Sequence, residues 1–171
     1  ALAGEFPKLK TFATLSPLTG FTSWLSEQWG TAADGDLFLP GERKRMARID
    51  KAQETREWLL EAVAERAWLG DPDLEKAVRP ILLRLAAGYL VRERRPDGGA
   101  LDSVAHFHLS NGARLHRLNW AADLSERGLE QSAGIMANYL YDDRQIEANH
   151  EAYRSRGKVV TAPAVRALLK D

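Results

Sequence analysis

The spacing of hydrophobic residues changes near residue 100, and this change restricts the possible folds more than any other feature of the sequence. Residues 11–16 (TFATLS) suit a short buried strand, whereas most of residues 19–94 have the composition and spacing of helices. After a turn at residues 96–99 (PDGG), hydrophobic and polar residues alternate. We therefore predict an α/β (mixed α+β) domain with a helical insertion between the first strand and a C-terminal β-hairpin.

The predicted hairpin consists of residues 103–109 (SVAHFHL) and residues 113–120 (ARLHRLNW), separated by Ser-Asn-Gly. Asn-Gly between two alternating segments is a strong local signal for a hairpin turn. Successive side chains of a strand point to opposite faces, so His106 and His108 would share one face. A further strand is predicted at residues 134–141 (GIMANYLY).

Turn residues divide the helical part of the sequence. Asp71 or Asp73 is expected to cap the central helix, in which Pro80 marks either a kink or the true start. Helices separated by loops are predicted at residues 19–29, in two segments within 42–69, at 148–156 and from 163 to 170, with a loop or short helix at 125–131.

The beginning of the chain has its own pattern. Residues 1–7 (ALAGEFP) resemble the end of a helix that Gly4 and Pro7 interrupt, and no initiator Met precedes them. We expect the numbering to begin inside a longer protein. The 171 residues themselves suffice for one domain with a substantial core.

Charge and cysteine content narrow the possible partners. The 24 basic residues equal the 24 acidic ones, so the sequence carries no electrostatic footprint for a nucleic acid or an anionic membrane. The absence of cysteine excludes disulfides, thiolate metal sites and a cysteine nucleophile. No hydrophobic run approaches the roughly 18 residues of a membrane span. We expect a cytoplasmic location, with an organelle matrix as the alternative.

Ser16 is the first candidate for chemistry, because it ends the predicted strand just before Pro17 and a helix. A hydroxyl group there faces the positive end of a helix dipole, which favours an anionic substrate group. The same position suits an ordinary helix cap. The segment lacks the Gly-x-Ser-x-Gly pattern of a nucleophile elbow.

His106 and His108 are the second candidates. Two histidines on one strand face suggest a metal, but no third ligand follows at suitable spacing, so no metal site is predicted. A single histidine serves well as a general acid or base, because its ordinary pKa lies near neutrality. A histidine that hydrogen-bonds a backbone carbonyl is the structural alternative.

Three separated blocks of the sequence resemble the malonyl-CoA decarboxylase family, in the order that the family has. Residues 15–22 (LSPLTGFT) are similar to its Leu-Ser-Pro-x-x-Gly-Phe segment. Residues 107–120 (FHLSNGARLHRLNW) and residues 132–141 (SAGIMANYLY) supply the other two blocks. The family's Gly-rich loop for the CoA pyrophosphate and its helical N-terminal domain have no counterpart here. The resemblance thus identifies residues 1–171 as a C-terminal portion of the catalytic domain.

The resemblance implies a domain related to the acetyltransferase (GNAT) fold and a homo-oligomer. It also implies decarboxylation of malonyl-CoA to acetyl-CoA and carbon dioxide without metal, biotin or pyridoxal. The family's catalytic serine, the proton acceptor, maps to Ser16, and its catalytic histidine, the proton donor, maps to His108. Three more residues fall in the matched blocks and are candidates for substrate binding: Asn119, Asn138 and Tyr139.

A thioester is itself the electron sink for loss of carbon dioxide, so the residues have only to orient, stabilise and protonate. The pair Ser16 and His108 is equally compatible with nucleophile and base in acyl transfer. Two alternatives therefore remain: an acyl-CoA N-acyltransferase of related fold, and a non-catalytic fragment that serves oligomerisation through an exposed strand edge.

Overall fold

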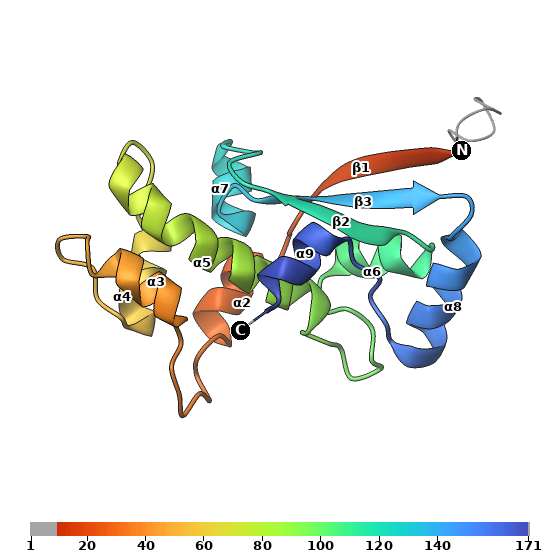
Figure 1. The fold of residues 1–171 in the computed structure, drawn as a ribbon, viewed down its shortest axis with the longest axis horizontal. Helices are drawn as coiled ribbons and strands as arrows, with labels where there is room; N and C mark the ends of the chain where they lie inside the picture. The colour runs from red at the N-terminus through yellow and green to blue at the C-terminus, as the bar shows by residue number, and fades with distance from the viewer. Residues whose placement is uncertain (1–9, 171) are drawn as a thin grey trace.

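The computed structural model describes residues 10–170, which form a three-stranded antiparallel sheet and eight helices (Figure 1). The prediction of a helix end at residues 1–7 lies outside the described residues. In chain order the elements are β1 (Thr11–Pro17), α2 (Phe21–Glu27), α3 (Pro40–Met46), α4 (Arg56–Ala64), α5 (Pro72–Val91), α6 (Ser103–Ser110), β2 (Arg114–Asn119), α7 (Glu126–Ser132), β3 (Met136–Asp142), α8 (Ile146–Arg156) and α9 (Pro163–Leu168).

The strands are ordered β1-β3-β2, so β3 is central and β1 is an edge strand. In the register of β1 with β3, Ser16 lies opposite Ala137 and Thr14 opposite Tyr139. Helices α6 and α9 cover one face of this sheet, and α5 runs beyond them toward α3 and α4 (Figure 1).

The prediction of a β-hairpin at residues 103–120 is wrong in its first arm. Residues 103–110 form α6, because Asp102 caps it by accepting a hydrogen bond from the amide of Ala105 at 2.9 Å. Ala105 and Leu109, one helical turn apart, are both buried. The second arm is a strand as predicted, but β2 pairs with β3.

The Asn-Gly pair therefore ends a helix and does not turn a hairpin. Asn111 is the C-cap residue of α6, and Gly112 has a positive φ of 88°. A Cβ atom at Gly112 would lie 2.4 Å from the carbonyl oxygen of Ile146, so α8 requires glycine there.

Most of the other predicted elements are confirmed. The two strands β1 and β3 lie where they were predicted from composition, and residues 42–69 contain the end of α3 and all of α4. Asp71 caps α5 and accepts a hydrogen bond from the amide of Leu74 at 3.1 Å. Because α5 begins at Pro72, Pro80 stands inside the helix and does not mark its start.

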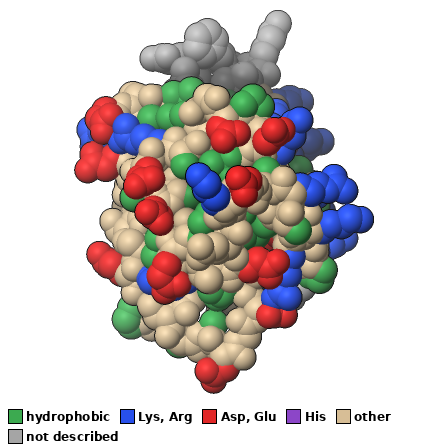
Figure 2. Space-filling model, turned by 90° about the vertical axis from the view of Figure 1, so that its left-hand side faces the viewer, with side chains coloured by type: hydrophobic (Ala, Val, Ile, Leu, Met, Phe, Trp, Pro, Cys, Tyr) green, Lys and Arg blue, Asp and Glu red, His purple; other side chains and the backbone are tan. Residues whose placement is uncertain are grey.

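The outer end of the molecule, formed by α3, α4 and the start of α5, carries acidic and basic side chains intermixed (Figure 2). Among its inner contacts, the buried Glu42 carboxylate accepts two hydrogen bonds from the Arg84 guanidinium, at 2.6 and 2.9 Å. Within residues 10–170, no helix is both long and apolar enough to cross a membrane.

Candidate active site

Ser16 and His108 stand 92 positions apart in the chain and meet in the structure. The Ser16 hydroxyl oxygen lies 3.2 Å from Nε2 of His108. Ser16 comes from the end of β1 and His108 from the last turn of α6. Their exposed fractions are 6% and 9%, so the pair is largely shielded from solvent. The distance is that of a hydrogen bond between a hydroxyl group and a general acid or base.

The sheet face under α6 fixes the His108 ring. Tyr139 of β3 stacks on this ring with the centroids 4.5 Å apart and the planes 22° from parallel. Ser16 lies on the same face of the sheet, since its register partner Ala137 is two residues from Tyr139. The strand pairing and the capped helix together hold the serine and the histidine in place.

Two further hydroxyl groups extend the pair. The Tyr141 hydroxyl lies 2.6 Å from Nδ1 of His108, and Ser16 donates a hydrogen bond to the Thr14 hydroxyl at 3.3 Å. With the Ser16 proton directed to Thr14, the proton between Ser16 and His108 belongs to Nε2. Nδ1 then accepts from Tyr141. The result is a continuous chain of donors from Tyr141 through His108 and Ser16 to Thr14.

Burial determines whether the His108 ring is charged. Desolvation lowers the pKa of His108, so at neutral pH the imidazole is uncharged. Burial also raises the pKa of Tyr141, which keeps its phenol protonated and able to donate. The resting site therefore consists of neutral donors and acceptors with no ion pair between them.

Tyr139 contributes its ring and not its hydroxyl group. Within the described part of the chain, the buried Tyr139 hydroxyl has no hydrogen-bond partner. Its surroundings raise the pKa of this phenol well above the usual value, chiefly through desolvation. The nearby Tyr89 hydroxyl donates instead to the Asp102 carboxylate at 3.0 Å. Asp102 thus links α5 to the cap of the helix that carries His108.

The sequence also proposed Asn119 and Asn138 as binding residues, and these lie elsewhere. The Asn138 side-chain amide donates to the carbonyl of Thr14 at 2.9 Å and accepts from Asn119 at 2.8 Å. Asn138 directly precedes Tyr139 in β3, so its side chain points to the other face of the sheet. The structure therefore brings Tyr139 to the Ser16–His108 pair but separates both asparagines from it.

His106 is also separated from His108, contrary to the prediction that they share a face. Two residues along a helix correspond to a rotation of about 200°. Nδ1 of His106 lies 2.7 Å from the Tyr153 hydroxyl of α8, on the side of α6 away from Ser16. Among residues 10–170, no group of three or more His, Asp or Glu side chains has the arrangement of a metal site.

Sequence reasoning missed the role of Tyr141. The signal was present, because Tyr139 and Tyr141 are two residues apart in a predicted strand and must share a face. Thr14 precedes Ser16 by the same interval in β1. The Asp102–Tyr89 contact had no local signal, since it depends on how α5 packs beside α6.

Comparison with known proteins supplies an independent test of the resemblance. The family model described as the malonyl-CoA decarboxylase C-terminal domain matches residues 1–171. The mitochondrial malonyl-CoA decarboxylase of Anser anser anser is 38% identical over 156 residues, which cover 89% of this chain and 31% of that protein. The protein of the same name from Rattus norvegicus is 36% identical over 174 residues, covering 98% of this chain and 35% of its own length.

Solved structures agree with these matches. The crystal structure of malonyl-CoA decarboxylase from Rhodopseudomonas palustris has a TM-score of 0.77 and 42% identity, and the match covers 97% of this chain and 37% of that one. The crystal structure of malonyl-CoA decarboxylase from Cupriavidus metallidurans also has a TM-score of 0.77, with 38% identity. That match covers 98% of this chain and 41% of that one. The chain spans about a third of the length of the curated relatives it matches.

Proposed function

The chain belongs to the malonyl-CoA decarboxylase family, and from this premise we propose that it supplies the proton-transfer groups for converting malonyl-CoA to acetyl-CoA and carbon dioxide. One observation carries the proposal: the Ser16 hydroxyl oxygen and Nε2 of His108 are 3.2 Å apart. Two residues so distant in sequence are brought together in a site that is shielded from water.

The proposed reaction requires the protein to orient the substrate and to protonate one carbon atom. Loss of carbon dioxide leaves an enolate whose charge lies on the thioester oxygen and whose carbon needs one proton. Ser16 hydrogen-bonds the malonyl group and orients its carboxylate out of the thioester plane, and His108 gives its Nε2 proton to the enolate carbon. A positioned acid of this kind contributes on the order of 10²–10⁴ in rate.

Tyr141 supports the proton transfer from His108. Its hydroxyl group, 2.6 Å from Nδ1, stabilises the His108 ring while the ring loses its Nε2 proton. Solvent returns a proton to the ring when acetyl-CoA leaves. The thioester accepts the electron pair, so these steps need no metal, biotin or pyridoxal.

Substrate reaches the pair at the free edge of β1. The sheet order leaves that edge unpaired within the described residues, and Thr14 and Phe12 on the inner face are only half-buried. Phe107, whose ring centroid lies 5.2 Å from that of His108, is 61% exposed. An exposed hydrophobic side chain beside a polar pair suits the apolar arm of an acyl thioester.

The proposal extends to the domain, the oligomeric state, the location and the partners of the protein. Residues 1–171 form a C-terminal portion of a catalytic domain related to the acetyltransferase fold, and the protein associates into homo-oligomers. A cytoplasmic location or an organelle matrix suits a reaction on CoA esters. Neither nucleic acid nor membrane is a partner.

The test uses the whole natural protein that contains these residues, with acetyl-CoA and carbon dioxide measured separately. We expect Ser16→Ala and His108→Gln each to lower kcat by about 10²–10⁴. Ser23→Ala, an exposed serine of α2, is the matched control and keeps the rate. Circular dichroism of each variant establishes that it is folded. A His108→Gln variant with full activity would show that the proton donor lies elsewhere.

The same samples separate decarboxylation from acyl transfer. Rapid acid quenching followed by mass spectrometry detects an acyl group on Ser16 if the serine is a nucleophile. We expect carbon dioxide release without such an adduct, and no faster turnover when an amine is added. An acylated Ser16, or amine-dependent turnover without carbon dioxide, favours the acyltransferase instead.

A further inference from the structure

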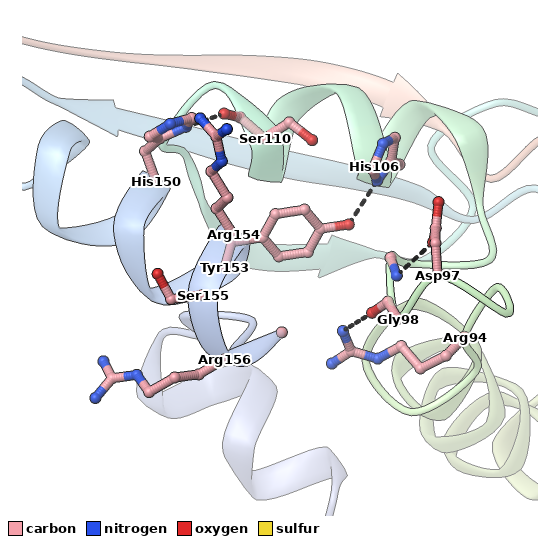
Figure 3. Close-up of a pocket in the computed structure, with 12 residues that line it drawn as sticks. Arg94, Asp97, Gly98, His106, Ser110, His150, Tyr153, Arg154, Ser155 and Arg156 are labelled. Atoms are coloured by element: carbon pink, nitrogen blue, oxygen red, sulfur yellow. Dashed lines mark hydrogen bonds between the residues drawn. The ribbon is translucent and has the colours of Figure 1, made fainter.

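A cavity of about 800 Å³ lies between α6, α8 and the loop of residues 94–99, away from the Ser16–His108 pair (Figure 3). Figure 3 shows Tyr153 reaching from α8 toward His106 of α6, while Arg94 lies beside Gly98 in the loop below His106. A volume of roughly 300–1,000 Å³ is usual for small-molecule sites. The cavity is therefore large enough for a ligand of about nucleotide size.

The cavity carries an excess of positive charge in a chain whose net charge is zero. Three arginines line it, Arg94, Arg154 and Arg156, whereas Asp97 is its one acidic lining residue. Within residues 10–170, none of these three guanidinium groups has a carboxylate at ion-pair distance. The same described region contains arginines that are paired, such as Arg84 with Glu42. Arg94 donates to the carbonyls of Val91 and Gly98, and Arg154 and Arg156 are exposed, so the cavity keeps a net positive charge.

Polar groups at its inner wall have fixed directions. The Tyr153 hydroxyl accepts from the amide of Ala100 at 2.8 Å, which leaves its own proton for Nδ1 of His106 at 2.7 Å. The contact with Tyr153 holds the His106 ring at the cavity wall. His150 donates from Nδ1 to the carbonyl of Ser110 at 2.5 Å, and this orients its ring at the cavity wall.

We propose that this cavity binds a phosphate-bearing small molecule, at a site separate from the decarboxylation site. Guanidinium groups match phosphate oxygens in geometry and stay charged at any physiological pH. A phosphate group carries about −1.5 to −2 charges at neutral pH, so three arginines at separate places around the cavity suit a ligand with more than one phosphate group better than a single carboxylate. His106 adds a polar ring to the lining of the cavity.

The cavity and the proposed decarboxylation site are separate because they lie on different sides of α6. His106 and His108 leave this helix about 200° apart, one toward α8 and the other toward the sheet. A ligand in the cavity therefore contacts the helix that carries His108 without contacting Ser16. Binding there is independent of whether the Ser16–His108 pair decarboxylates malonyl-CoA.

The experiment is isothermal titration calorimetry on the whole natural protein that contains these residues, with inorganic pyrophosphate and ADP as probes and malonate as a dicarboxylate comparison. We expect both phosphate probes to bind with a Kd below about 1 mM at low salt, and malonate at least about tenfold more weakly. Binding should weaken as salt is raised, because exposed arginines supply much of the attraction.

Substitutions of cavity residues test whether pyrophosphate binds in this cavity. We expect the double variant Arg154→Gln and Arg156→Gln to raise the Kd for pyrophosphate about tenfold, which corresponds to about 1.4 kcal/mol. Arg79→Gln, an exposed arginine of α5 outside the cavity, is the matched control and changes the Kd by less than about twofold. His108→Gln leaves pyrophosphate binding unchanged, so this result does not depend on the proposed reaction.

Three results overturn the proposal. The first is no heat of binding from either phosphate probe at roughly millimolar concentration. The second is binding that the double variant does not weaken, since the ligand then sits elsewhere. The third is loss of pyrophosphate binding in the presence of saturating CoA, because the cavity would then be part of the substrate site.

Discussion

Replacing Tyr141 by phenylalanine tests whether the hydroxyl group behind His108 contributes to the reaction. The change removes one oxygen, which lies 2.6 Å from Nδ1, and keeps the ring that stacks on Phe12 at 4.9 Å between centroids. A hydrogen bond to a neutral group contributes about 0.5–1.5 kcal/mol, and one to a charged group about 1.5–3 kcal/mol. The contribution grows when the His108 ring gives up its proton.

The expected loss therefore falls on kcat. Because the bond is stronger in the transition state than in the resting enzyme, Tyr141→Phe should lower kcat and kcat/KM by a similar factor. The charged bond exceeds the neutral bond by about 1–1.5 kcal/mol, which corresponds to roughly 5- to 13-fold in rate. The assay is steady-state release of carbon dioxide from malonyl-CoA at pH 7, with folding checked by thermal denaturation.

Tyr139→Phe is the matched control, because it removes the same atom from the neighbouring tyrosine of the same strand. The Tyr139 ring also contacts His108, but its hydroxyl group has no partner among residues 10–170. We expect kcat to stay within about twofold of the natural protein. Equal losses in the two variants would refute the relay, since ring packing and not the Tyr141 hydroxyl would then explain them.

The other predictions concern stability. Tyr139→Phe should leave the midpoint of thermal unfolding unchanged or raise it, because a buried hydroxyl group without a partner costs about 1–3 kcal/mol. Burial lowers the pKa of His108 below the roughly 6.5 of an unfolded imidazole, so the unfolded chain takes up the proton first. Stability present above about pH 6.5 should be lost as the pH falls toward the folded pKa, and His108→Gln should flatten this part of a urea-denaturation profile. Asp102→Ala should cost about 2–4 kcal/mol in chemical denaturation, since it removes the cap of α6 and leaves the Tyr89 hydroxyl unpaired, whereas Asp102→Asn should retain most of the stability. Arg84→Met should cost about 3–5 kcal/mol by leaving the buried Glu42 carboxylate without its positive partner, and adding Glu42→Gln should recover part of the loss.

Local patterns predicted the strands well and failed at α6, for a physical reason. The sequence SVAHFHLS alternates with period two, but Ala105 and Leu109 are also spaced as one helical turn. In eight residues both readings fit equally well, and the Asp102 cap together with burial against the core favours the helix. Asn-Gly is equally compatible with a hairpin turn and a helix end.

The candidate site was predictable in part from the same alternation. Asn138 and Tyr139 are consecutive residues of a strand, so they cannot both line a site on one face. Tyr141 shares the face of Tyr139 and was therefore the better candidate. The meeting of Ser16 with His108 had no local signal, because it depends on the register of β1 against β3 and on the docking of α6. Only the family resemblance pointed to that pair.

The neutral state of His108 affects the barrier of the proposed decarboxylation. The malonyl carboxylate is negatively charged before carbon dioxide leaves, and an imidazolium ion beside it would stabilise that ground state and raise the barrier. Desolvation lowers the pKa of His108, and Tyr141 holds the ring at Nδ1, so the donor that faces Ser16 is uncharged. An uncharged N–H donor binds the carboxylate weakly but still delivers a proton to the far more basic enolate carbon. The burial that makes this histidine look like a core residue thus suits it to the proposed decarboxylation.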